Sequence, residues 1–151
     1  MKKLTHQLLV ILLGLGLMAG TAYADDTPVF TGETEGVAIE GYDVVSYFTE
    51  GRPAKGSPRY SHEWHGVEWH FASEEHLTMF RKNPERYAPA YGGHCAYGVY
   101  VGKKLAASPY FWTIHEGRLY LNLNEEVQES WRGDLAANVE TANDNWPDNL
   151  E

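Results

Sequence analysis

Apolar and polar residues alternate along two stretches of this chain, and each stretch predicts a β-hairpin. In residues 60–71 the apolar positions recur at every second residue on both sides of a His65-Gly66 turn. A two-residue turn that ends in glycine suits a tight antiparallel connection. The turn sets the register, which is expected to pair Trp64 with Val67, His62 with Trp69, and Tyr60 with Phe71.

The second alternating stretch is residues 111–123, which surround a Glu116-Gly117 turn. The hairpin is followed by Asn124, a favoured helix cap, and by apolar residues at helical spacing. Gly133 interrupts this helical pattern and Asp134 restarts it. We therefore expect a hairpin followed by two consecutive helices.

A helix is also predicted directly after the first hairpin. Ser73 is a favoured N-cap, and the acidic residues that follow it suit the positive end of the helix dipole. Phe80 falls on the buried face, and His76 lies one turn before it on the same side. A second, shorter helix begins at Pro84, because proline is well suited to a first helical turn.

These elements predict an α+β fold in a single small domain, with two β-hairpins packed against three or four short helices. The 151 residues suit one domain with one core. No internal repeat stands out in the sequence. Residues 41–147 are expected to form the domain, after a lead-in at 25–40 and before a polar tail at 148–151.

The first 24 residues have the pattern of a secretory signal peptide. Lys2 and Lys3 precede an apolar run, and Ala22-Tyr23-Ala24 resembles a cleavage site. We expect an exported protein located in the periplasm, with no membrane insertion after cleavage. The chain has 21 acidic and 12 basic residues and a net charge of −9, which argues against nucleic acid as a partner.

The candidate chemistry centres on residues 91–98, a glycine-rich stretch that holds His94 and Cys95. Cys95 is the only cysteine in the sequence, so an internal disulfide, a dithiol motif and a thiolate cluster are excluded. Thiolate and imidazole donors suit Cu(I) or Zn(II) better than Mg²⁺ or Ca²⁺. We expect a metal site at Cys95 and His94, completed by His76 or His70 if the fold brings them close.

Several motifs in order resemble an exported YHS-domain protein. They are residues 41–48, 56–58, 69–73, 80–87 and 91–98, followed by 119–124 and 143–147. The resemblance implies a small α+β fold over nearly the whole mature chain and a role in heavy-metal handling, often of copper. The metal-associated pattern of that family carries cysteines at two positions where this chain has Ala72 and His76. Only His76 can therefore take over a family ligand position.

The expected function is that of an exported binding protein for a soft metal ion, rather than an enzyme. Copper is the expected ion and zinc the alternative, and the partners are the metal and a metal-handling protein. A thiol-dependent redox role of Cys95 is a second hypothesis. A non-catalytic interaction domain with an inert, buried cysteine is a third.

Overall fold

The first hairpin is present in the computed structural model, which describes residues 28–151. It consists of the antiparallel strands β1 (Ser57–Trp64) and β2 (Val67–Phe71). His65 and Gly66, both with positive φ, form the turn between them. The predicted signal peptide lies outside the described residues, and no described helix is long and apolar enough to cross a membrane.

The register of this hairpin is confirmed near the turn and wrong at the far end. Trp64 pairs with Val67 and His62 with Trp69, as predicted. Phe71, however, pairs with Ser57 instead of Tyr60, because the register shifts between Ser57 and Ser61. Such an irregularity places extra residues on one strand, which a strict alternation pattern does not reveal.

Four short helical segments surround the first hairpin. A 3-10 turn and a single helical turn precede it, and the predicted helix and its shorter successor follow it: η1 (Ala38–Gly41), α1 (Ser46–Thr49), α2 (Glu74–Lys82) and α3 (Pro84–Tyr87). Ser73 caps α2 by accepting a hydrogen bond from the His76 amide, as its position predicts.

The second half of the chain has the same kinds of element in the same order. They are η2 (Ala90–Gly93), α4 (Ala96–Tyr100), β3 (Ser108–His115), β4 (Arg118–Asn122), α5 (Glu125–Gly133) and α6 (Leu135–Asn145). The α+β fold class with two hairpins is thus confirmed. Within residues 28–151 there are six α-helices, since α1, α3 and α4 add short helices of four or five residues.

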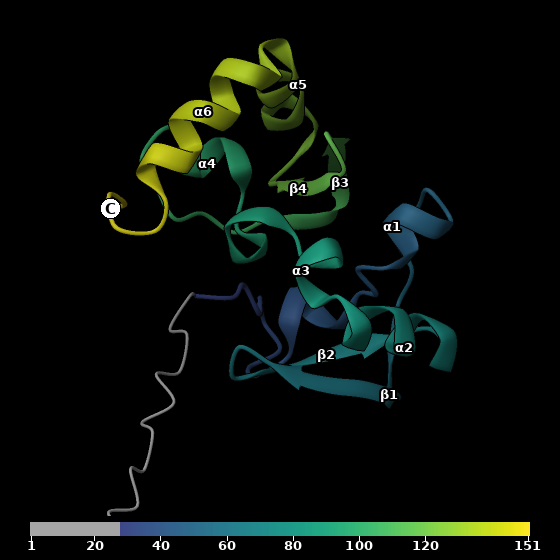
Figure 1. Cartoon of the computed structure of the whole chain (residues 1–151). Helices are drawn as coiled ribbons and strands as arrows, with labels where there is room; N and C mark the ends of the chain where they lie inside the picture. The colour runs from purple at the N-terminus through teal and green to yellow at the C-terminus, as the bar shows by residue number, and fades with distance from the viewer. Residues whose placement is uncertain (1–27) are drawn as a thin grey trace, which may run out of the picture.

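The two halves are copies of one structural unit, so the inference that the chain has no internal repeat is wrong. In each copy, a four-residue 3-10 turn and a short helix lead to a hairpin with an eight-residue and a five-residue strand. A nine-residue helix follows in both, α2 in the first repeat and α5 in the second. Figure 1 shows the two hairpins with their helices as two lobes, with α3 at the junction between them.

Backbone geometry supports the correspondence residue by residue. Ile39 in η1 has φ 49° and ψ 40°, and Tyr91 in η2 has φ 56° and ψ 37°. The register shift at Ser57 in β1 recurs at Ser108 in β3. Asn83, after α2, has φ −154° and ψ 76°, and Asp134, after α5, has φ −148° and ψ 76°.

The main core is continuous across both repeats. Phe71 and Phe80 of the first repeat belong to the same buried cluster as Cys95, Leu119 and Leu121 of the second. A second cluster, which includes Tyr120 and Trp131, lies between the second hairpin and its helices. The shared cluster explains why two repeats form one domain rather than two.

The segment before the first repeat joins the two repeats through Phe30. Its amide donates to the Gly92 carbonyl in η2, and its own carbonyl accepts from the Ile39 amide in η1. The chain approaches Gly92 so closely that a Cβ there would overlap the Pro28 carbonyl oxygen. Gly92 has a φ of 59°, a region that side chains disfavour. This glycine is therefore required by backbone packing.

Replacing Gly92 by alanine is expected to cost more stability than the same change at Gly51. Both glycines have positive φ, but nothing lies within 4 Å of a Cβ at Gly51. Gly51→Ala should lower the free energy of unfolding by about 1 kcal/mol, from backbone strain alone. Gly92→Ala should cost at least about 2 kcal/mol, since it adds a steric clash. Urea denaturation measures both, and equal losses would contradict the packing role of Pro28.

Candidate functional site

The four residues expected to form a metal site make their contacts with four different sets of neighbours. Within residues 28–151, no group of three or more His, Cys, Asp and Glu side chains is arranged to hold a metal ion. Each of the four is described below with its own surroundings, because these decide what each side chain is able to do.

His76 is held in a buried hydrogen-bonded pair with Asp43. Its Nδ1 lies 2.6 Å from the Asp43 Oδ2, and its Nε2 lies 3.2 Å from the Thr49 hydroxyl oxygen. Only 9% of His76 and none of Asp43 is exposed to solvent. Both ring nitrogens therefore have partners in this structure, one of them a carboxylate.

Asp43 connects three elements of the first repeat. Its Oδ1 accepts a hydrogen bond from the Val45 amide, just before α1. Its Oδ2 accepts from the Ala72 amide, at the end of β2, as well as pairing with His76 in α2. A buried carboxylate is tolerated only when its oxygens are satisfied in this way. The pair therefore fixes α1 and α2 relative to the hairpin.

His70 lies apart from this pair, near the end of β2. Its Nε2 contacts the Glu68 carboxylate on the same strand, and about half of the Glu68 side chain is exposed. Residues two apart on a strand point to the same face, so this contact is local and needs no other element. His70 is close to Gly41 in η1.

Cys95 is fully buried. None of its surface is exposed, and its side chain belongs to the main core cluster. The Asn122 amide group donates to its sulfur across 3.9 Å. The thiol thus has a polar neighbour from β4, but solvent does not reach it.

His94 turns to a different side of the loop from Cys95. Its ring packs between Phe30 and Trp146, with centroids 5.7 and 5.8 Å away. Burial lowers the pKa of His94 to about 4, the positive charge of Lys104 acts in the same direction, and a backbone group of Leu105 opposes both. The imidazole is therefore uncharged at neutral pH. Its Nε2 is buried and has no hydrogen-bond partner among the described residues.

The repeat explains why Cys95 stands where it does. The Asp43 amide donates to the Ala54 carbonyl, and the Cys95 amide donates to the Leu105 carbonyl in the same way. Cys95 is thus the counterpart of Asp43. The helix caps give a second correspondence, because Ser73 accepts from the His76 amide and Asn124 accepts from the Val127 amide. A thiol and a valine replace the carboxylate and imidazole in the second repeat.

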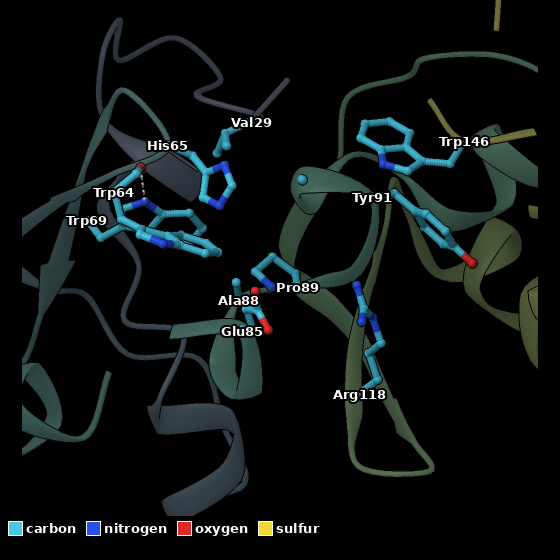
Figure 2. A pocket seen from close by; sticks show the side chains of 11 residues that line it. Val29, Trp64, His65, Trp69, Glu85, Ala88, Pro89, Tyr91, Arg118 and Trp146 are labelled. Atoms are coloured by element: carbon cyan, nitrogen blue, oxygen red, sulfur yellow. Dashed lines mark hydrogen bonds between the residues drawn. The ribbon is translucent and has the colours of Figure 1, made fainter. Parts of the chain in front are cut away.

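A cavity of about 310 Å³ opens at the junction of the two repeats. Figure 2 shows Trp64, His65 and Trp69 of the first hairpin on one side and Tyr91 and Trp146 on the other. Residues of α3 and of the chain that follows it lie between the two sides, and Arg118 is at the start of β4. The remaining lining residues are Val29, Glu85, Ala88, Pro89, Gly92 and Arg118. Neither Cys95 nor any other predicted ligand lines this cavity.

Sequence reasoning missed both the Asp43 pair and the cavity. Asp43 lies after Gly41 and before an apolar run, and an acidic residue in such a place is a signal for a backbone-capping role. The cavity joins residues from both ends of the chain, and no local pattern indicates such a junction.

Removal of the Asp43 carboxylate is expected to destabilise the protein more than removal of a surface cap. Asp43→Ala leaves His76 and two backbone amides without their partner, and should lower the free energy of unfolding by about 3 kcal/mol or more. Asp134 caps α6 through the Ala137 amide at the surface, so Asp134→Ala should cost about 1 kcal/mol. Urea denaturation of both variants tests this, and a loss at Asp43 no larger than that at Asp134 would contradict it.

The stability of the protein is expected to fall more steeply in acid because of His94. Its pKa is about 4 in the folded protein, against an ordinary value of 6.5, so the unfolded chain binds more protons between these values. Stability from this group is therefore complete above pH 6.5 and is lost as the pH falls toward 4. His94→Phe keeps an aromatic ring without the titration.

Denaturation midpoints between pH 7 and pH 4 compare the two proteins. The free energy of unfolding of the wild type should fall by on the order of 1 to 2 kcal/mol more than that of His94→Phe. This is less than the full free-energy equivalent of the pKa shift, because the His94 ring is only partly buried. Parallel pH profiles would show that His94 does not titrate in this way.

Comparison with known protein families finds a match to most of the first repeat. The YHS domain family matches residues 45–91, which run from the start of α1 to the second residue of η2. No curated protein and no solved structure matches the chain. The second repeat, which has the same elements in the same order, lies almost entirely outside the match. Residues 45–91 are therefore a YHS domain, a module generally associated with metal handling, copper included.

Proposed function

We propose that this protein is a non-catalytic, exported binding protein that receives and releases a soft metal ion, Cu(I) in the first place and Zn(II) as the alternative. The proposal assigns the ion to the loop of the second repeat that holds His94 and Cys95. Its partners are the ion and a metal-handling protein that supplies or accepts it.

The observation that carries the proposal is the state of the His94 imidazole. It is uncharged at neutral pH, and its buried Nε2 has no hydrogen-bond partner among the described residues. A neutral imidazole with a free ring nitrogen is the form that binds metal ions. The association of YHS domains with metal handling supports the same assignment.

Cys95 supplies the second donor in this proposal. A thiolate is the ligand that favours Cu(I) over the hard divalent ions. Cys95 follows His94 directly but is fully buried, so the loop has to open before the sulfur reaches an ion. The redox hypothesis requires the same opening, because a thiol that cycles through sulfenic acid must be accessible.

His70 and His76 are less suitable as primary ligands. Each has a ring nitrogen against a carboxylate, of Glu68 and Asp43 respectively. A carboxylate on one ring nitrogen also orients ligating histidines in metal sites. For His76, however, the Nε2 that such an orientation would present contacts Thr49. We therefore leave these two residues out of the proposed ligand set.

The proposal is tested by titrating the reduced protein with Cu(I) against a competing chromogenic chelator. The wild type should bind one ion per chain, and both His94→Gln and Cys95→Ala should lower the affinity by at least about tenfold, since each removes a donor. His70→Gln is the matched control, because it removes a histidine whose contact is local to β2. It should bind as the wild type does. The same series with Zn(II) decides between the two ions.

Two outcomes would overturn the assignment. If His76→Gln or His70→Gln abolishes binding while His94→Gln does not, the site lies in the first repeat. If no variant and no wild-type sample binds Cu(I) or Zn(II) more tightly than a short histidine peptide does, the protein is not a metal carrier. Circular dichroism of each variant verifies that the fold is retained.

A further inference from the structure

The cavity at the junction of the repeats has the composition of a ligand site that contains neither proposed metal ligand, although Tyr91 and Gly92 of the metal loop line it. Its volume of about 310 Å³ lies at the lower end of the range found for small-molecule pockets, so it suits a ligand of single-ring size. Pockets of this kind form preferentially between structural units. Here one wall comes from the first hairpin and the other from the second repeat and the C-terminal segment (Figure 2).

Aromatic rings make up most of both walls. Trp64 and Trp69 belong to the first hairpin, with ring centroids 5.6 Å apart. Tyr91 and Trp146 form the opposite wall, with centroids 5.9 Å apart. Trp69 and Tyr91 are nearly fully buried, which fixes their orientation. Preformed aromatic walls favour a planar, apolar ligand body, because ring stacking adds to the gain from burial.

Arg118 gives the cavity a cation that has no counter-ion. Among residues 28–151, no carboxylate oxygen lies within 4.0 Å of its guanidinium, and no hydrogen bond engages it. The positive charge of Arg118 lowers the pKa of the Tyr91 hydroxyl in the cavity wall, although burial raises that pKa by more. In a chain with 21 acidic residues and 12 basic ones, an arginine without a carboxylate is available to an anion from outside.

The fold holds the Arg118 backbone at this position without needing an arginine there. The Arg86 guanidinium in α3 donates to the Gly117 carbonyl across 3.0 Å, which anchors the tip of the second hairpin beside the cavity. The counterpart of Arg118 in the first hairpin is Val67, since each follows the two-residue turn. The first repeat thus forms the same hairpin with an apolar residue. The arginine is therefore a feature of the cavity and not of the fold.

We propose that this cavity binds a small aromatic carboxylate. The ring of the ligand lies between the tryptophan and tyrosine walls, and its carboxylate pairs with the Arg118 guanidinium, whose planar fork matches a carboxylate. Glu85, on the rim of the cavity, accepts a hydrogen bond from a hydroxyl or ammonium group on the same ligand. The ligand is held without covalent chemistry.

Isothermal titration calorimetry with three matched compounds tests the proposal on the metal-free protein. The compounds are 4-hydroxyphenylacetate, its uncharged amide and tyramine, which have the same ring and differ in the charge of the side group. The acid should bind one molecule per chain, and the amide and tyramine should bind at least about tenfold more weakly, because a charge-assisted pair is lost. Arg118→Gln should weaken binding of the acid to a similar degree and should leave the amide unaffected.

Arg52→Gln is the matched control, since Arg52 pairs with Glu50 at the surface and does not line the cavity. It should bind the acid as the wild type does. The indole N–H resonances of Trp64 and Trp146 in a ¹⁵N spectrum report the location, and saturating acid should shift both. Equal affinities for acid and amide, or an unchanged Arg118→Gln variant, would overturn the pairing. Binding that leaves both indole signals in place would overturn the location, and no binding of the acid at all would overturn the proposal.

These outcomes are distinguishable from those of the metal experiment. Cys95→Ala alters no residue that lines the cavity, whereas His94→Gln removes a ring that packs on Trp146. Arg118→Gln alters neither proposed metal ligand. Failure to bind metal would not contradict the aromatic carboxylate site, and failure to bind the acid would not contradict the proposed metal site.

Discussion

One buried carboxylate organises the first half of this molecule. Asp43 accepts hydrogen bonds from the turn before α1 and from the end of β2, and it pairs with His76 in α2. Taking a carboxylate out of water costs several kcal/mol, and only a full set of donors offsets this. The arrangement therefore tolerates little variation in the relative positions of the elements that supply those donors. The YHS match at residues 45–91 covers the elements that this carboxylate holds together.

The second repeat connects its corresponding elements through apolar side chains instead of a carboxylate and an imidazole. Where Asp43 and His76 meet in the first repeat, the second has Cys95 and Val127, both of which belong to or pack against the main core. Replacing a buried polar pair with apolar side chains of similar volume is often neutral for stability. This explains why the lone cysteine is buried so deeply, and it gives Cys95 a packing role that is compatible with a metal-binding one.

The sequence predicted the elements of this fold well and their relationships poorly. Alternation and turn glycines located both hairpins, and Ser73 and Asn124 located the starts of two helices, because those signals are local. The register beyond Ser61 and the repeat itself were missed. Few residues are identical between the two copies, yet both contain Ser-Pro at the start of a hairpin, a turn that ends in glycine, and a cap followed by two glutamates. Those three signals recur at the same spacing and would have revealed the repeat.

The candidate sites were harder to predict, because they depend on which distant residues meet. Cys95 and His94 were found from their chemistry, but adjacent side chains diverge, and sequence alone did not show that one enters the core while the other packs on Trp146. Arg118 and Trp64 lie in different repeats. Their meeting at one cavity follows from how the two repeats pack, and no pattern within either repeat specifies it.

Phe30 has a consequence for how the chain reaches this structure. Its amide and its carbonyl bind Gly92 and Ile39, which lie in corresponding loops of the two repeats. The contact between Phe30 and Gly92 closes a long loop, and such contacts form more slowly than local ones. The N-terminal segment is synthesised before either loop, yet its own hydrogen bonds are complete only when the second repeat has begun to fold. The two copies are therefore expected to fold in one cooperative transition, and a chain that ends before Gly92 lacks the acceptor of the Phe30 amide.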